Sequence, residues 1–150
     1  MIVKFINPRG NEGLAMQAQA QNQIPIRGKI YLANAFSLSM VEQLLQRSPV
    51  TLRLERINTE TVKFFLTSQS FISAIGHAAT ANALSKILGI NIPANRTTIT
   101  MSEGDLLIVF QLSIGRLPPG KELTEEEIIK AYNEGKAYFV LVYSPETVEE

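Results

Sequence analysis

The chain of 150 residues has no cysteine and no tryptophan, and His77 is its only histidine. Without cysteine it can form neither disulfide bonds nor thiolate zinc sites. A metal centre would therefore have to consist of carboxylates, which suit magnesium or calcium. We expect a protein that folds without a bound metal.

Long hydrophobic runs are absent too. In the first ten residues, MIVKFINPRG, Lys4 and Arg9 leave an apolar run too brief for a signal peptide or a membrane span. With 45% hydrophobic and 19% charged residues, the chain has the composition of one globular domain with a substantial core. We therefore expect an intracellular protein that has no membrane partner.

The formal net charge is zero, which disfavours the binding of a long nucleic acid by electrostatics alone. The charges are nevertheless unevenly distributed. Residues 1–100 carry ten lysines and arginines against four acids, whereas residues 101–150 carry four against ten. The basic part could hold a small anionic ligand.

The hydrophobic periodicity predicts an α/β fold. The predicted strands are residues 29–35, 50–57, 97–101, 105–113 and 136–144, and the predicted helices are residues 37–48, 58–68, 73–89 and 125–134. Residues 97–101 and 105–113 flank Ser-Glu-Gly, which predicts a β-hairpin. The order β-α-β-α-α-β-β-α-β indicates a mixed sheet of five strands with helices packed on it.

Two helix boundaries carry specific signals. Gly89 is typical of the glycine that follows the last helical residue, and Thr124 with Glu127 forms the pattern of a capping box. We expect one domain over residues 29–150. Residues 1–28 are an N-terminal extension, either an added edge strand or a polar linker.

The segment GRLPPGKE, residues 115–122, matches most of the phosphate-binding pattern G-x-x-x-x-G-K-[ST]. Pro118 and Pro119 remove two N–H donors, and Glu122 stands where the hydroxyl residue belongs. We therefore expect a turn into a capped helix and not a P-loop.

His77 has two interpretations. It stands seven residues before Leu84, so on a continuous helix both side chains would face the core, which favours a packed, hydrogen-bonded histidine. If Gly76 and His77 instead lie at the helix start, free N–H groups and the helix dipole favour an anion such as a phosphodiester. The alanines that follow would let a ligand or a second subunit approach closely, and histidine suits proton transfer near neutral pH.

Other polar residues could converge with His77. Asn34 and Ser37 follow the first main strand, where open α/β sheets usually bind their ligands. Arg96 precedes one predicted strand and Arg116 follows another. Each has an alternative role, because Asn34 and Ser37 could cap the next helix and a single arginine is usually solvated.

Four segments together are similar to one known family. KIYLANAFSLSM, SAIGHAATANALSKILG, the pair NR before a strand, and GRLPPGKELTEEEI resemble the ring nucleases of the type III anti-CRISPR family, which are small viral proteins. The resemblance covers residues 29–144. It implies a homodimer that uses no metal or other cofactor, cleaves cyclic tetraadenylate at its two-fold axis, and blocks type III CRISPR signalling in the cytoplasm of the infected cell.

The resemblance also implies roles for individual residues. His77 matches the catalytic histidine, and we expect Arg116 to stabilise charge on phosphorus. Further residues are expected to bind the ligand, namely Asn34, Ser37, Gly76, Arg96 and Gln111. Family members carry a glutamate where this chain has Pro119, so a carboxylate bordering the family's site is missing, and Glu122 is the nearby acid.

Two other functions stay open at this point. The loss of the glutamate is compatible with a sponge that binds the cyclic nucleotide without cutting it. A small viral DNA-binding regulator is the third hypothesis, which the neutral net charge and the lack of a recognition motif disfavour.

Overall fold

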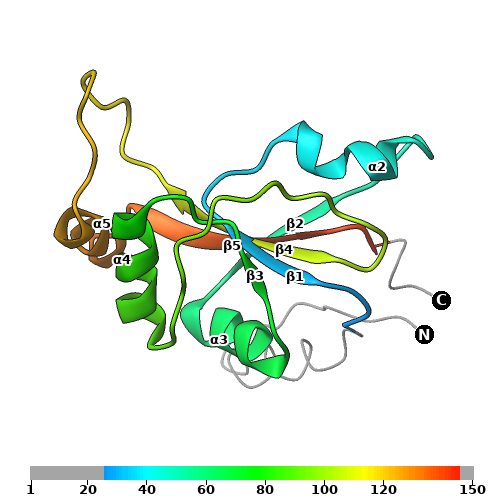
Figure 1. Cartoon of the computed structure of the whole chain (residues 1–150), viewed down its shortest axis with the longest axis horizontal. Helices are drawn as coiled ribbons and strands as arrows, with labels where there is room; N and C mark the ends of the chain where they lie inside the picture. The colour runs from blue at the N-terminus through cyan, green and yellow to red at the C-terminus, as the bar shows by residue number, and fades with distance from the viewer. Residues whose placement is uncertain (1–25, 146–150) are drawn as a thin grey trace.

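The computed structural model describes residues 26–145, so the expected edge strand or linker over residues 1–28 lies almost wholly outside the described residues. Five strands form one sheet in the order β2-β5-β4-β1-β3 (Figure 1). They are β1 (Ile30–Ala33), β2 (Arg53–Ile57), β3 (Ile72–Ser73), β4 (Leu106–Leu112) and β5 (Ala137–Tyr143). β1 pairs in parallel with β3 and β4, while β5 pairs antiparallel with β4 and β2. The predicted mixed five-stranded sheet is therefore confirmed.

Helices cover both faces of this sheet. On one face lie α3 (Thr59–Ser68), α4 (Ala78–Leu88) and α5 (Glu125–Asn133), and on the other lie the 3-10 helix η2 (Leu38–Val41) and α2 (Glu42–Leu45) (Figure 1). On β1, Ile30 and Leu32 are buried in the first layer, whereas Tyr31 and Ala33 are buried in the second. Burial on both faces explains why this strand is apolar throughout.

Residues 97–101 form no strand, so the predicted hairpin is wrong. β4 already pairs with β1 on one side and β5 on the other, which leaves it no free edge. Apolar and polar residues alternate in this segment because Ile99 and Met101 are buried in the layer of α2, whereas the threonines next to them are exposed. The N–H of Met101 donates to the carbonyl oxygen of Met40 at 2.8 Å. The segment thus crosses a face of the sheet and does not extend the sheet (Figure 1).

The strand that sequence periodicity missed is β3, which is too short to show any periodicity. The observed order is therefore β-α-β-α-β-α-β-α-β, with η2 and α2 counted as one helical segment, and the predicted order is wrong. The helix predicted over 73–89 begins later, at Ala78, because Ser73 belongs to β3 and residues 74–77 connect the two elements. Gly89 ends it with a φ of 72°, the left-handed conformation expected of that glycine.

Side-chain caps define two further helix starts. At α5, Glu127 N–H donates to Thr124 Oγ1 at 3.1 Å, and Thr124 N–H donates to Glu127 Oε1 at 2.9 Å, which confirms the capping box. At α3, Thr61 N–H donates to Asn58 Oδ1 at 2.9 Å. None of the helices within residues 26–145 is both long and apolar enough to cross a membrane.

Candidate functional site

The chain topology gathers most of the predicted site residues at one end of the sheet. Because β1, β3 and β4 run in the same direction, their carboxyl ends meet there. Asn34 follows β1, Gly76 and His77 lie between β3 and α4, and Gln111 is the penultimate residue of β4. Arg116 lies in the loop 113–124, which projects from the body of the molecule (Figure 1).

His77 occupies the N-cap of α4. Its backbone is extended, with φ −116° and ψ 132°, and its side chain makes no capping hydrogen bond. The imidazole is exposed, so the interpretation as a packed core histidine is wrong. The seven-residue spacing to Leu84 does not put both side chains on one helix face, because His77 precedes the first helical residue. Leu84 lies within α4 and is fully buried.

Arg96 lies next to the start of α4. Its Nε donates to the carbonyl oxygen of Gly76 at 3.2 Å, and a Cβ placed on Gly76 would come within 3.2 Å of Arg96 Cγ. The neighbouring Asn95 fixes this approach, since its Nδ2 donates to Ser73 O at 2.7 Å and its backbone N–H donates to Ile75 O at 2.8 Å. The structure thus brings Arg96 and Gly76 together, and it adds Asn95 as a positioning residue that sequence reasoning missed.

A cavity of about 380 Å³ lies at the start of α4. His77 and the next three residues form one wall, and Lys121, Glu122 and Leu123 of the projecting loop form another. The Glu122 carboxylate makes no hydrogen bond or ion pair with the part of the chain that the structure describes. Lys121, by contrast, is paired with Glu127 at 3.2 Å. The cavity is therefore lined by a histidine and by a glutamate whose carboxylate is uncommitted within the described residues.

Several predicted site residues do not reach this cavity. Arg116 is exposed and does not line it, although Leu117 does. Gln111 is exposed on the face of the sheet that carries α2, and its Nε2 donates to Leu112 O at 2.9 Å. Ser37 stands at the N-cap of η2 without a side-chain capping bond, and its Oγ lies 2.9 Å from Ser39 Oγ. Asn34, Gly76 and Arg96 do not line the cavity either, so His77 is the one predicted site residue among its lining residues.

Electrostatic contacts hold the wall formed by the projecting loop. Lys86 of α4 pairs with Glu125 at the start of α5, and this carboxylate raises the pKa of the Lys86 ammonium. The N–H of Thr124 holds the pKa of Glu127 below its usual value. Within residues 26–145, no three histidine or acidic side chains gather closely enough to hold a metal ion.

Comparisons with known proteins identify the family. Residues 30–137 match the STIV B116-like family. The uncharacterized protein ORF116 of Acidianus filamentous virus 1 is 32% identical over 116 residues, which cover 76% of this chain and 96% of the relative. ORF117 of Acidianus two-tailed virus, also uncharacterized, is 36% identical over 86 residues, or 56% of this chain and 68% of the relative.

A solved structure agrees with these sequence matches. B116 of Sulfolobus turreted icosahedral virus is similar with a TM-score of 0.60 and 32% sequence identity, over 77% of this chain and 99% of that one. The fold, the matched residues and the viral relatives lead to one conclusion. The chain belongs to the STIV B116-like family, which includes small viral proteins.

Proposed function

We propose that the protein is a metal-independent ring nuclease that binds cyclic tetraadenylate and cleaves it to linear di-adenylate carrying a 2′,3′-cyclic phosphate. By removing this messenger it would block type III CRISPR signalling in the cytoplasm of the infected cell. The observation that carries the proposal is the position of His77, which is exposed at the N-cap of α4, makes no capping bond and lines a cavity there. The proposal also rests on the resemblance of residues 29–144 to ring nucleases.

The reaction needs no nucleophile from the protein. The ribose 2′-oxygen attacks the adjacent phosphorus, the bond from phosphorus to the 5′-oxygen breaks, and the 2′-hydroxyl proton passes to water. The His77 imidazolium donates its proton to the departing 5′-oxygen. Free N–H groups in the first turn of α4 and the Arg96 guanidinium favour the negative charge of the phosphodiester.

Glu122 supports His77 in this proposal. Both residues line the same cavity, and the carboxylate has no partner within the described residues. A carboxylate that accepts a hydrogen bond from one imidazole nitrogen orients the ring and stabilises its protonated form. Glu122 would thereby take over the part of the carboxylate that is missing at position 119.

A second copy of the chain completes the site. The expected ligand-binding residues do not line the His77 cavity of their own chain, namely Asn34, Ser37, Gly76, Arg96 and Gln111. The resemblance implies a pocket shared by two protomers, in which these residues would meet one ligand. A cyclic tetranucleotide has the two-fold symmetry that such a homodimer requires. In the dimer, two copies of His77 would serve opposite phosphodiesters.

Incubation of the protein with cyclic tetraadenylate in EDTA, followed by separation of the products, tests the proposal. Linear di-adenylate is expected from the wild type. Unchanged ligand that co-purifies with the protein would instead support the sponge, which the exposure of Arg116 outside the cavity favours as the second candidate.

Glu122→Gln tests the supporting carboxylate. We expect the cleavage rate to fall about tenfold or more, because a less well positioned acid transfers its proton less efficiently. Glu103→Gln, an exposed acid beside α2, serves as the control. An unchanged rate in Glu122→Gln would exclude this role.

A further inference from the structure

A second cavity, of about 550 Å³, lies at the opposite end of α5 from the His77 cavity. Leu123 and Ile128, at the start of α5, line the His77 cavity, whereas Tyr132 and Asn133, at its end, line the second one. The two cavities share no lining residue. Neither the resemblance nor the proposed reaction uses the second cavity.

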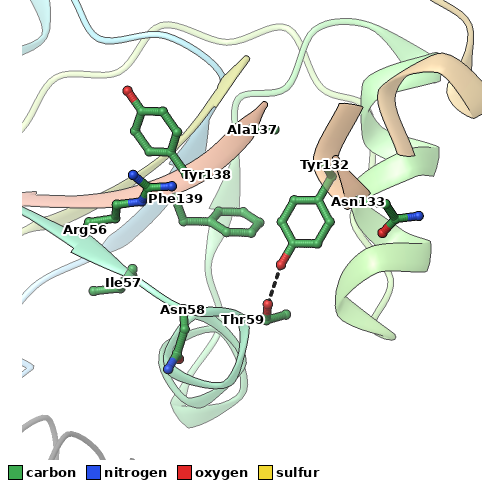
Figure 2. A pocket seen from close by; sticks show the side chains of 9 residues that line it. All are labelled: Arg56, Ile57, Asn58, Thr59, Tyr132, Asn133, Ala137, Tyr138 and Phe139. Carbon is green, nitrogen blue, oxygen red and sulfur yellow. Dashed lines mark hydrogen bonds between the residues drawn. The ribbon is translucent and has the colours of Figure 1, made fainter. Parts of the chain in front are cut away.

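The cavity forms where two neighbouring strands part. β2 ends at Ile57, opposite Phe139, whereas β5 already begins at Ala137. Past this pair β2 leads into α3 and diverges from β5, and the cavity fills the wedge between them (Figure 2). Ala137 and Tyr138 pair with β4 on their other side only. Because alternate residues of a strand direct their backbone groups to opposite sides, one of the two presents an N–H and a C=O toward the wedge.

One wall of the cavity carries a positive charge that no acid neutralises. The Cζ atom of Arg56 lies 4.2 Å from the centroid of the Tyr138 ring, so the guanidinium stacks on that ring (Figure 2). Among residues 26–145, Arg56 forms no salt bridge, and no aspartate or glutamate lines the cavity. Stacking fixes the plane of the guanidinium and leaves its N–H edge available to a phosphate or carboxylate.

The opposite wall is aromatic and has a polar rim. The rings of Tyr132 and Phe139 meet edge to face, with centroids 6.2 Å apart and an interplanar angle of 63°. The hydroxyls of Tyr132 and Thr59 lie 2.6 Å apart and share a hydrogen bond across the cavity from Arg56 (Figure 2). The Phe139 ring is fully buried and supports Tyr132, whose half-buried ring is the aromatic surface that a planar ligand could contact.

We propose that this cavity binds a nucleoside monophosphate. The base would lie against Tyr132, the phosphate would bind the N–H edge of Arg56, and the backbone group of β5 that faces the wedge would bond to the base or the sugar. The volume falls in the range of small-molecule sites, about 300 to 1,000 Å³. This inference is independent of the ring nuclease activity, because the two sites share no residue.

Titration of the full chain with adenosine 5′-monophosphate, followed by calorimetry and by amide NMR shifts, tests the inference. We expect saturable binding with the largest shifts at residues 56–59 and 137–139. Adenosine alone and inorganic phosphate alone should each bind more weakly, since each offers only half of the recognised groups. Equal affinity for inorganic phosphate would overturn the assignment of a nucleotide.

Two arginine variants complete the test. Arg56→Gln should weaken binding about tenfold or more, because it removes a charge-assisted hydrogen bond to phosphate. Arg47→Gln removes the same charge from an exposed arginine near α2 and should leave the affinity unchanged. The inference is overturned if no saturable binding occurs, if Arg56→Gln binds like the wild type, or if the shifts centre on the His77 cavity and disappear in His77→Ala.

Discussion

At the scale of the single residue, the character of His77 depends on where α4 begins. A helix starting at residue 73 would have turned the imidazole into the core together with Leu84. Instead, Ser73 is part of β3 and pairs with β1, and Asn95 makes two hydrogen bonds, to residues 73 and 75, that fix the segment between β3 and α4. His77 therefore becomes the N-cap, and its ring is exposed. Sequence periodicity could not reveal this, because the fixing contacts come from residues about twenty positions away.

Part of the candidate site could be predicted from residue types alone. Of the two interpretations of His77, the one that places Gly76 and His77 at a helix start is confirmed, and the strand-end position of Asn34 followed from the strand pattern. The bond from Arg96 to Gly76 and the approach of Glu122 to the His77 cavity depend on how two loops fold back. No local pattern encodes such loop geometry.

Glu55 offers a residue-scale prediction outside the site. Burial raises the pKa of this carboxyl, an effect that the nearby Arg53 guanidinium partly offsets, and Glu55 Oε1 is buried without a hydrogen-bond partner among residues 26–145. The folded chain therefore binds the Glu55 proton more tightly than the unfolded chain does. The stabilising contribution of this proton is complete below the pKa of the unfolded chain and is lost as the pH rises through the folded-state pKa. Glu55→Gln removes this dependence.

The gain in the free energy of unfolding from Glu55→Gln should be larger at pH 7 than at pH 4. We expect the two gains to differ by about half a kcal/mol, because Glu55 is only half-buried and solvent screens the effect. Urea denaturation at both pH values measures this difference, with the exposed Glu60→Gln as control. A gain that does not change with pH would be inconsistent with the raised pKa.

At the scale of the element, the strongest local signals located the helices and strands well. Caps marked the starts of α3 and α5, a glycine marked the end of α4, and long apolar runs marked β1, β4 and β5. The wrong predictions concern segments whose secondary structure depends on whether a neighbouring strand has a free edge. Residues 97–101 alternate like a strand but find no free edge on β4, and β3 is a strand only because β1 offers an edge to it.

The capping box of α5 leads to a prediction at this scale. Thr124→Ala removes the acceptor for the Glu127 N–H at the end of the loop that forms one wall of the His77 cavity. We expect a loss of about 1 kcal/mol in the free energy of unfolding, measured by urea denaturation. Thr98→Ala, at an exposed position outside the helices, should change it by less than about 0.5 kcal/mol. Equal losses in the two variants would show that the cap contributes nothing specific.

At the scale of the whole molecule, the account depends on two copies acting together. A single chain of 16.6 kDa leaves Asn34, Ser37 and Gln111 outside the His77 cavity. The sheet face that carries α2 also leaves Leu54 of β2 and Leu38 of η2 exposed, by 61% and 69%. Exposed apolar side chains on one face are compatible with an interface between copies.

Sedimentation equilibrium should therefore give twice the mass of the chain at micromolar concentration. Cyclic tetraadenylate should bind with one ring per dimer, because in the proposed complex the ring would occupy the two-fold axis. A monomer that binds one ring per chain would contradict the two-copy site while leaving the assignment of His77 open to the cleavage assay.

Cleavage of cyclic tetraadenylate in EDTA by wild type and His77→Ala, compared side by side, tests the proposed role of His77. We expect the wild type to form linear di-adenylate and His77→Ala to form it about 10² to 10⁴ times more slowly. The affinity for the ring should be largely kept, since in the proposed reaction His77 would act only on the departing 5′-oxygen. An Arg47→Ala control should cleave like the wild type. Cleavage by His77→Ala at the wild-type rate, or none by either protein, would contradict the account.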